Sequence, residues 1–369
     1  MNRNFFEKYV SNTPTGTSHN NLLLEEKPIR ETYRAWFRVA VPGSFRWRFY
    51  FTNTVNSTMN DGEVAYPDRP GGNWKILSAR VGACPAPDTE WEQSAEVLFD
   101  GEKEKAVAPD ETFWSDEVAL SVKEGGYLLW EWTIEGNGIP FTGDSMVTAK
   151  RLTADGWISD DRCPKPDLLG CDRKVKKRIA FLGDSITEGC ETPIDACDHW
   201  AGRLAFHLGE DYAVWNIGLG FARASDAAYH KSWMKKAMEY DAVNVSFGVN
   251  DINSGACGKH LAGDSADEVL ASLEAIVKPL REAGKQVILF GVPAFDFDYD
   301  AQKLTTWETV NAHIPLLADK YGCAYYDFAA VTDCPGHHGH GRYQPHPTGY
   351  GCWLIEQDLW EKLGEVYRA

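Results

Sequence analysis

The sequence predicts two architectures in one chain: an all-β sandwich, followed by an α/β domain whose parallel sheet is covered by helices on both faces. Three observations predict this. Before residue 153 the apolar residues occur in short runs that are rich in aromatic and β-branched side chains. After residue 177 short apolar runs alternate with helical stripes. A chain of 369 residues is also longer than one hydrophobic core usually organises.

Seven short segments before residue 153 are expected to be strands. Turn signals such as Pro42-Gly43 and Asp100-Gly101 separate them. Seven strands at this spacing are typical of a sandwich or jelly roll. The expected strands are residues 33–39, 45–51, 74–81, 95–99, 117–122, 127–134 and 146–152.

Strands and helices are expected to alternate in the second part of the chain, which implies right-handed crossovers and a parallel sheet. The expected strands are residues 178–182, 213–216, 242–247, 286–290 and 324–327. The expected helices are residues 198–208, 225–239, 266–283, 304–320 and 349–363. We therefore expect a β-domain over residues 1–152, a polar linker over 153–176 and an α/β domain over 177–369.

Composition narrows the class of protein. Apolar residues make up 43% of the chain and charged residues 25%, as in ordinary soluble proteins. The net charge of −17 argues against nucleic acid and anionic membranes as partners. No apolar run is long enough to span a bilayer, and the first residues lack a signal-peptide pattern, so we expect a cytoplasmic protein. The nine cysteines are scattered without a C-x-x-C pair, which favours reduced thiols over disulfides or a zinc site.

Polar clusters follow three of the expected strands, and a fourth precedes the last helix. They are Gly183-Asp184-Ser185, residues 216–221, residues 248–251 and His346-Pro347-Thr348. Taken singly, such residues are ordinary helix caps and turns. In an open α/β sheet, however, functional sites form at the carboxyl ends of the strands. Together the clusters offer a nucleophile, a base and oxyanion donors.

The order of these clusters resembles the SGNH (GDSL) hydrolase family, named for Ser, Gly, Asn and His in four blocks. Here the blocks are "GDSIT" with Ser185, "NIGLGF" with a glycine, "GVND" with Asn250 and "HPT" with His346. The resemblance covers about residues 177–363 and implies a flavodoxin-like, three-layer hydrolase domain. The upstream β-rich region resembles the N-terminal jelly-roll domain that many bacterial SGNH esterases carry.

Two blocks depart from the family pattern. The second block usually reads N-x-G-x-x-G, which would place its last glycine at Phe221, and we expect the amide of Gly220 to be the oxyanion donor. The fourth block usually reads Asp-x-x-His, but Tyr343 stands three residues before His346. The imidazole then needs another acceptor, either a backbone carbonyl within residues 343–345 or an acid such as Asp333, unless Ser185 and His346 act as a dyad.

The resemblance implies ester hydrolysis through an acyl-enzyme, with Ser185 as nucleophile and His346 as base. The amides of Ser185 and Gly220 and the side chain of Asn250 would hold the oxyanion. This chemistry requires no metal or cofactor. Asp184 is expected mainly to orient its loop, and the candidate contacts for the substrate are Phe221, Asp184 and Trp307.

Substrate class is suggested by the aromatic content and by the domain arrangement. The chain has 14 tryptophans, of which some are candidates for stacking on sugar rings. A sandwich fused to an SGNH domain resembles carbohydrate O-acetylesterases that act on xylan- or mannan-derived oligosaccharides. We expect such an esterase. The alternatives are a short-chain carboxylesterase with another substrate and a carbohydrate-binding protein on a decayed esterase scaffold.

The His-rich segment 337–346 is expected to border the active site rather than to bind a metal.

Overall fold

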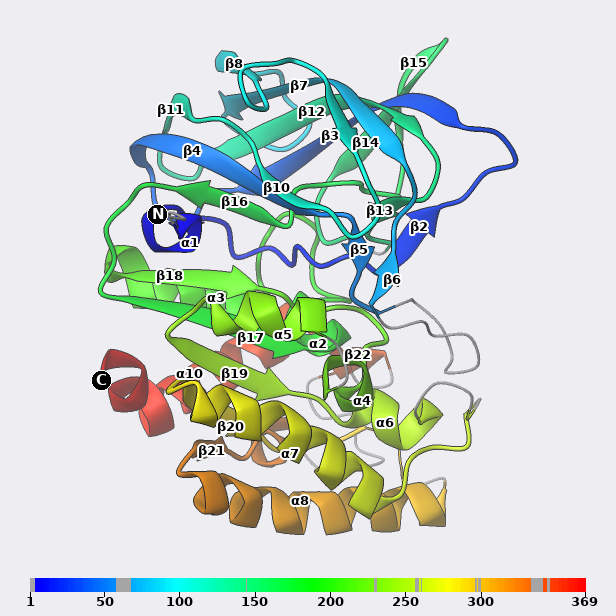
Figure 1. The fold of residues 1–369 in the computed structure, drawn as a ribbon. Helices are drawn as coiled ribbons and strands as arrows, with labels where there is room; N and C mark the ends of the chain where they lie inside the picture. The colour runs from blue at the N-terminus through cyan, green and yellow to red at the C-terminus, as the bar shows by residue number, and fades with distance from the viewer. Residues whose placement is uncertain are drawn as a thin grey trace.

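The fold is taken from a computed structural model, which describes residues 4–57, 68–143, 145–228, 231–255, 259, 261–295, 297, 300–332, 341–343 and 346–369. The side chains of residue 231 and residues 341–343 are outside the description. The β-rich region and the α/β region lie one above the other, and the N-terminal helix α1 (Phe5–Lys8) lies where they meet (Figure 1).

Two antiparallel sheets form the β-rich region. In the first, the order is β1 (Val10–Ser11), β16 (Leu168–Cys171), β4 (Gly43–Thr52) and β10 (Thr112–Trp114), with β11 (Val118–Val122) also on β4. In the second, the order is β15 (Gly156–Ser159), β14 (Ala149–Thr153), β3 (Ile29–Arg38), β12 (Tyr127–Gly136), β7 (Trp74–Cys84) and β8 (Gln93–Val97), with β9 (Lys105–Val107) on β7. Two further pairs join β2 (Asn21–Leu23) to β13 (Ile139–Phe141) and β5 (Thr54–Val55) to β6 (Arg69–Pro70).

Aromatic side chains from both sheets fill the space between them. The ring of Trp130 on β12 lies 4.8 Å from that of Phe49 and 5.8 Å from that of Phe51, both on β4. In β11 buried and exposed residues alternate, as expected for a strand with one face on a core. All seven expected strands are present, and the predicted sandwich is confirmed.

The segment 153–176, expected to be a linker, contributes two strands to the sandwich. Strand β15 extends the edge of the second sheet, and β16 lies between β1 and β4 in the first. The linker prediction fails because β16 has only four residues in a polar, proline-containing segment, too short to give a periodic signal. The other predicted domain boundaries stay predictions.

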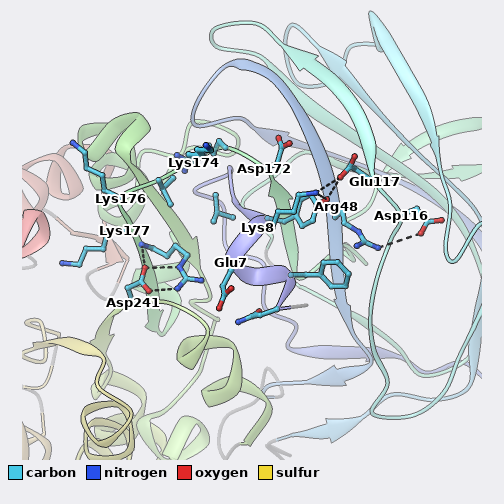
Figure 2. Close-up of a pocket in the computed structure, with 17 residues that line it drawn as sticks. Glu7, Lys8, Arg48, Asp116, Glu117, Asp172, Lys174, Lys176, Lys177 and Asp241 are labelled. Atoms are coloured by element: carbon cyan, nitrogen blue, oxygen red, sulfur yellow. Dashed lines mark hydrogen bonds and ion pairs between the residues drawn. The ribbon is translucent and has the colours of Figure 1, made fainter. Parts of the chain in front are cut away.

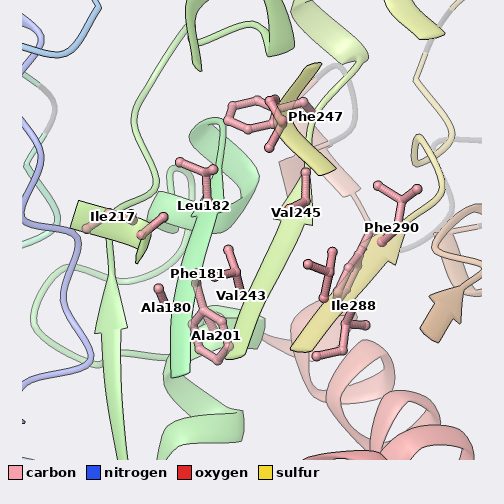
Figure 3. Close-up of a cluster of buried hydrophobic side chains, with 14 of the residues drawn as sticks. Ala180, Phe181, Leu182, Ala201, Ile217, Val243, Val245, Phe247, Ile288 and Phe290 are labelled. Carbon is pink, nitrogen blue, oxygen red and sulfur yellow. The ribbon is translucent and has the colours of Figure 1, made fainter. Parts of the chain in front are cut away.

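A five-stranded sheet organises the α/β region, and all its pairs are parallel. The strands are β18 (Tyr212–Asn216), β17 (Lys177–Gly183), β19 (Ala242–Ser246), β20 (Gln286–Phe290) and β21 (Ala324–Tyr326), in that spatial order. Counted along the chain this is the order 2-1-3-4-5 of flavodoxin-like folds. Side chains such as Phe181, Val243 and Ile288 are fully buried in its core (Figure 3). The predicted parallel α/β domain is confirmed.

Helices cover both faces of this sheet (Figure 1): α7 contacts both α4 and α8, and α3 contacts α10. In place of the expected helix 225–239 the structure describes two helices, one up to residue 228 and one from residue 231, and residues 229–230 are outside the described residues. The helices are α2 (Ser185–Glu188), α3 (Trp200–Leu208), α4 (Ala224–Ala228), α5 (Lys231–Met238), α6 (Val249–Ser254), α7 (Ala266–Glu282), α8 (Ala301–Tyr321), α9 (Ala329–Thr332) and α10 (Gly349–Arg368), with a short 3-10 turn, η1 (Gly209–Asp211). None of the described helices is long and apolar enough to cross a membrane.

Residues 11–20 form a buried segment between the two regions. On the sandwich side, the N–H of Asn12 donates to the carbonyl of Leu169. On the α/β side, the N–H of Thr17 donates to the carbonyl of Asn216, and the hydroxyl of Ser18 donates to that of Ile217. These groups therefore find hydrogen-bond partners without belonging to a long strand. The segment joins the sandwich to the loop that follows β18.

Candidate active site

Ser185 and His346 come together at the carboxyl end of β17. Ser185 is the first residue of α2, and the side chain of Asp184 caps this helix by accepting the N–H of Ile186 at 3.0 Å. His346 lies in the short strand β23 (His346–Pro347), and its Nε2 is 2.9 Å from Ser185 Oγ. This distance is within reach for proton transfer from a nucleophile to a base.

The imidazole of His346 is supported from the neighbouring strand ends. Phe295, which follows β20, presents its ring edge-on at a centroid distance of 6.1 Å. His346 pairs with Tyr343 of β22 (Gly341–Tyr343). Asp333 and residues 344–345 are outside the described residues. The identity of the group that holds Nδ1 therefore stays a prediction.

Asn250, in the third block, contacts the loop of the second block through its side chain. It is the second residue of α6, which begins directly after Gly248. Position 248 requires glycine, because its φ is 130° and an added Cβ would collide with the side chain of Val292. The side-chain amide of Asn250 donates to the carbonyl of Ala222 at 3.0 Å. Because this amide has two N–H groups, the second is left for another acceptor. Asn250 is thus placed to donate a hydrogen bond to an oxyanion.

Gly220 does not supply the free amide that the sequence predicts. Its N–H donates to Oε2 of the buried Glu188 at 2.6 Å, because Glu188, at the end of α2, faces the loop of the second block. The next residue, Phe221, has a φ of 59°, in the left-handed region that favours glycine. Its N–H has no acceptor among the described residues. The Gly220 N–H is therefore already used, and the Phe221 N–H is the candidate oxyanion donor of this loop.

The sequence of this part of the chain matches a known family. Residues 181–354 fit the model of the GDSL-like lipase/acylhydrolase family. This part of the chain is a GDSL-like hydrolase domain. The protein is therefore a hydrolase of carboxylic esters. No curated protein matches the sequence.

Solved structures similar to the chain each cover about half of it. LAE5, an alpha/beta hydrolase enzyme from the metagenome of Lake Arreo, is 20% identical and covers 52% of this chain and 96% of its own, with a TM-score of 0.43. A mutant of the acetylxylan esterase Axe2 from Geobacillus stearothermophilus is 17% identical and covers 52% and 95%, with a TM-score of 0.42. A lipolytic protein of the G-D-S-L family from Veillonella parvula is 20% identical and covers 50% and 96%, with a TM-score of 0.41.

Two of the predicted substrate contacts in the GDSL-like domain have other roles. Asp184 is buried, and its carboxyl group caps α2. Its burial raises its pKa to about 7. The indole N–H of Trp307 donates to the carbonyls of Val292 and Pro293, both at 3.1 Å, and thereby supports the loop after β20. The side chain of Phe221 is 46% exposed and remains a candidate contact.

Asp251, which follows Asn250, is a buried carboxyl group that the sequence suggested only as turn chemistry. It accepts the N–H groups of Ala224 at 2.9 Å and Ser225 at 3.3 Å, at the start of α4. Burial is the main cause that raises its pKa, to about 7. Asp251 therefore ties the third block of the GDSL-like domain to the helix that follows the second block.

A cavity of about 970 Å³ lies at the opposite end of β17 from Ser185 (Figure 2). Charged residues line it, and several form pairs, such as Arg178 with Asp241 at 2.6 Å and Lys8 with Glu117 at 3.1 Å. It is separate from the candidate catalytic residues of the GDSL-like domain, because Lys177 and Arg178 begin β17, and Ser185 follows the other end of this strand.

Metal ligation finds no support in the described part of the chain, where no group of three His, Cys, Asp or Glu residues is arranged to hold an ion. His337, His338 and His340 are outside the described residues, so their expected place beside the active site stays a prediction.

Proposed function

We propose that this esterase is a carbohydrate O-acetylesterase, which removes acetyl groups from xylan- or mannan-derived oligosaccharides through an acyl-enzyme. The observation that carries the chemistry is the 2.9 Å distance between Ser185 Oγ and His346 Nε2. A serine hydroxyl so close to an imidazole nitrogen is the arrangement that activates it as a nucleophile.

In the first half of the reaction, His346 Nε2 accepts the proton of Ser185 as Oγ attacks the carbonyl carbon of the acetyl ester. The N–H groups of Ser185 and Phe221 and the free N–H of Asn250 donate to the oxyanion that forms. When this intermediate collapses, the C–O bond to the sugar breaks, and His346 gives its proton to the sugar oxygen. In the second half, His346 activates water, which attacks the acyl-enzyme and releases acetate and Ser185.

An exposed aromatic pair a few residues after the base along the chain supports a sugar as the alcohol part of the substrate. Tyr350 and Trp353 are 60% and 41% exposed, and their ring centroids are 5.7 Å apart with planes inclined at 24°. They lie in the first turns of α10, which begins three residues after His346. Exposed aromatic rings offer flat apolar faces that match the C–H face of a pyranose ring. A sugar is also neutral, as suits a chain with a net charge of −17.

The second candidate is a short-chain carboxylesterase with a substrate other than a carbohydrate. The apolar edge of Phe295 against His346 favours a small acyl group, whatever alcohol it is joined to. The third alternative is a carbohydrate-binding protein whose esterase scaffold has lost its activity. The hydrogen-bonding distance between Ser185 and His346 argues against it.

The experiment compares acetate release from acetylated xylo- and manno-oligosaccharides with hydrolysis of 4-nitrophenyl acetate. We expect the wild type to act on all three, and Tyr350→Ala and Trp353→Ala to lose more activity on the oligosaccharides than on the small ester. Leu316→Ala removes an exposed apolar side chain of α8 and serves as the matched control. Hydrolysis of 4-nitrophenyl acetate without acetate release from either oligosaccharide would refute the carbohydrate substrate and leave the esterase.

A further inference from the structure

Glu188 is a buried acidic residue that touches three parts of the active-site framework. It is the last residue of α2, the helix that begins with Ser185. Its Oε2 accepts the N–H of Gly220 at 2.6 Å, and the thiol of Cys190 lies 3.8 Å from the same oxygen. Only 1% of Glu188 is exposed. One side chain therefore links the nucleophile's helix to the loop that carries the oxyanion donor.

Almost all the backbone N–H groups in the loop of the second block already donate hydrogen bonds to protein acceptors. Five of the six N–H groups from Ile217 to Ala222 donate to protein acceptors, and that of Phe221 has none among the described residues. The pairs are Ile217 to Phe181 O at 2.9 Å, Gly218 to Asn216 Oδ1 at 2.9 Å, Leu219 to Gly183 O at 3.0 Å, Gly220 to Glu188 Oε2 at 2.6 Å and Ala222 to Leu219 O at 3.2 Å. Glu188 is the one acceptor in this set that is an acidic side chain.

The loop is also pressed closely against α2. A Cβ added at Gly218 would lie 2.5 Å from the backbone nitrogen of Glu188, so this position requires glycine. Phe221 adopts a left-handed backbone with a φ of 59°, a conformation that a non-glycine residue keeps only when its surroundings impose it. The hydrogen bond to Glu188 fixes the Leu219–Gly220 peptide group, one peptide group before the one that carries the Phe221 N–H.

Two residues outside the GDSL-like domain, Gly16 and Lys165, also interact with Glu188. A Cβ added at Gly16, in the buried segment 11–20, would lie 3.0 Å from Glu188 Cγ. Lys165 is a buried lysine whose Nζ donates to Ser145 Oγ at 3.2 Å. Its burial lowers its pKa, and its attraction to acidic neighbours, which include Glu188, opposes this change. The buried segment 11–20 thus packs closely against Glu188, and Lys165, which precedes β16, attracts its acidic side chain.

We propose that Glu188 is a positioning residue for the esterase reaction, in which it holds the Gly220 amide and thereby leaves the Phe221 amide free for the oxyanion. This inference rests on the proposed ester hydrolysis. Without an acceptor for its N–H, Gly220 would carry an unsatisfied buried donor, and the loop would rearrange to satisfy it. Because Gly16 and Lys165 lie outside the GDSL-like domain, the part of the chain before this domain contributes to catalysis through the shape of this loop.

The test compares two substitutions of similar size. Glu188→Gln keeps a side-chain oxygen that accepts the Gly220 N–H, whereas Glu188→Leu keeps the volume and removes the acceptor. With 4-nitrophenyl acetate we expect kcat to fall about 100-fold in Glu188→Leu, since losing one oxyanion donor costs about 10²–10³ in kcat. We expect KM to change less than threefold and Glu188→Gln to stay within tenfold of the wild type. Phosphorylation of Ser185 by diethyl 4-nitrophenyl phosphate should slow in parallel, because its tetrahedral phosphoryl group uses the same donors.

A control and a second variant keep the test decisive. Thr142→Ala removes a buried hydrogen bond of 2.7 Å to the carbonyl of Ser18, so it should lower the melting temperature and leave kcat unchanged. Gly16→Ala keeps Glu188 but presses a methyl group against it, and should lower kcat several-fold with little change in KM, even if Glu188→Leu does not fold.

Three outcomes would overturn the inference. The first is a kcat equal to that of the wild type in Glu188→Leu or in Gly16→Ala. The second is an equal loss of kcat in Glu188→Leu and Glu188→Gln. The third is a loss of kcat in Thr142→Ala as large as that in Glu188→Leu. A wild type that hydrolyses no ester would overturn the proposed function itself, which distinguishes the two failures.

Discussion

Lys236 and Asp167 form an ion pair in which both side chains are almost completely buried, at 2% and 1% exposure. Lys236 belongs to α5 of the GDSL-like domain, and Asp167 directly precedes β16 of the sandwich. The carboxylate also accepts the N–H of Thr52 at 2.6 Å. Burial alone would raise the pKa of Asp167, but Lys236 and His19 hold it at about 2. The pair is thus a charged contact between the two regions.

Lys236→Met should destabilise the protein by about 3–5 kcal/mol, because it leaves the charge of Asp167 buried without its partner. The free energy of unfolding in urea, followed by tryptophan fluorescence, measures the effect. Lys235→Met changes an exposed lysine of the same helix and should cost less than about 0.5 kcal/mol. Equal stability of the two variants would show that the pair contributes nothing to the contact between the regions.

Asn250→Ala should lower kcat for ester hydrolysis by about 10²–10³ with little change in KM, since its free N–H donates only to the oxyanion. Steady-state kinetics with 4-nitrophenyl acetate provide the measurement. Asn253→Ala is the matched control, because Asn253 lies on the same helix but its side chain faces Lys303. A kcat in Asn250→Ala equal to that of the control would exclude Asn250 from the oxyanion site.

The stability of the protein should fall as pH rises, because of Asp184. Burial raises the pKa of this group from 3.8 to about 7, so the folded state binds its proton more tightly than the unfolded state. The stabilisation is therefore complete below about pH 4 and is lost as pH rises through 7. Asp251 has the same raised pKa and contributes in the same direction.

Asp184→Asn keeps an oxygen that can accept the N–H of Ile186 and removes the titrating group. Relative to the wild type, this variant should be more stable at pH 8 than at pH 5, as measured by urea unfolding at the two pH values. If the difference in unfolding free energy between variant and wild type is the same at both pH values, Asp184 does not titrate in this range.

Most of the fold was predictable because its signals are local. The five parallel strands are short apolar runs that end in polar clusters, and the sandwich strands carry the aromatic residues that fill its core. Strand β16 and the segment 11–20 escaped prediction. The sequence of that segment is "SNTPTGTSHN", which is polar, yet all of it is buried because its backbone bonds to both regions. Such burial depends on tertiary contacts and leaves no periodic pattern.

In the candidate site, the sequence indicated the candidate residues but not the hydrogen bonds that they make. Ser185, Asn250 and His346 were found because each stands at an element end where an α/β sheet gathers its functional groups. The bond between the Gly220 N–H and Glu188 was not foreseen, because the residue type does not reveal which amide is already bonded. That information lies in Glu188, which belongs to another block. Asp184 and Trp307 are polar or aromatic residues near the site whose hydrogen bonds go to the backbone, and only coordinates show this.

The central claim is that Ser185 is the nucleophile of an ester hydrolase. The most direct measurement is the rate of 4-nitrophenyl acetate hydrolysis by the wild type and by Ser185→Ala, purified in parallel. The account predicts that the variant loses on the order of 10³-fold or more in kcat while its melting temperature stays near that of the wild type. Equal rates for the two proteins would contradict it.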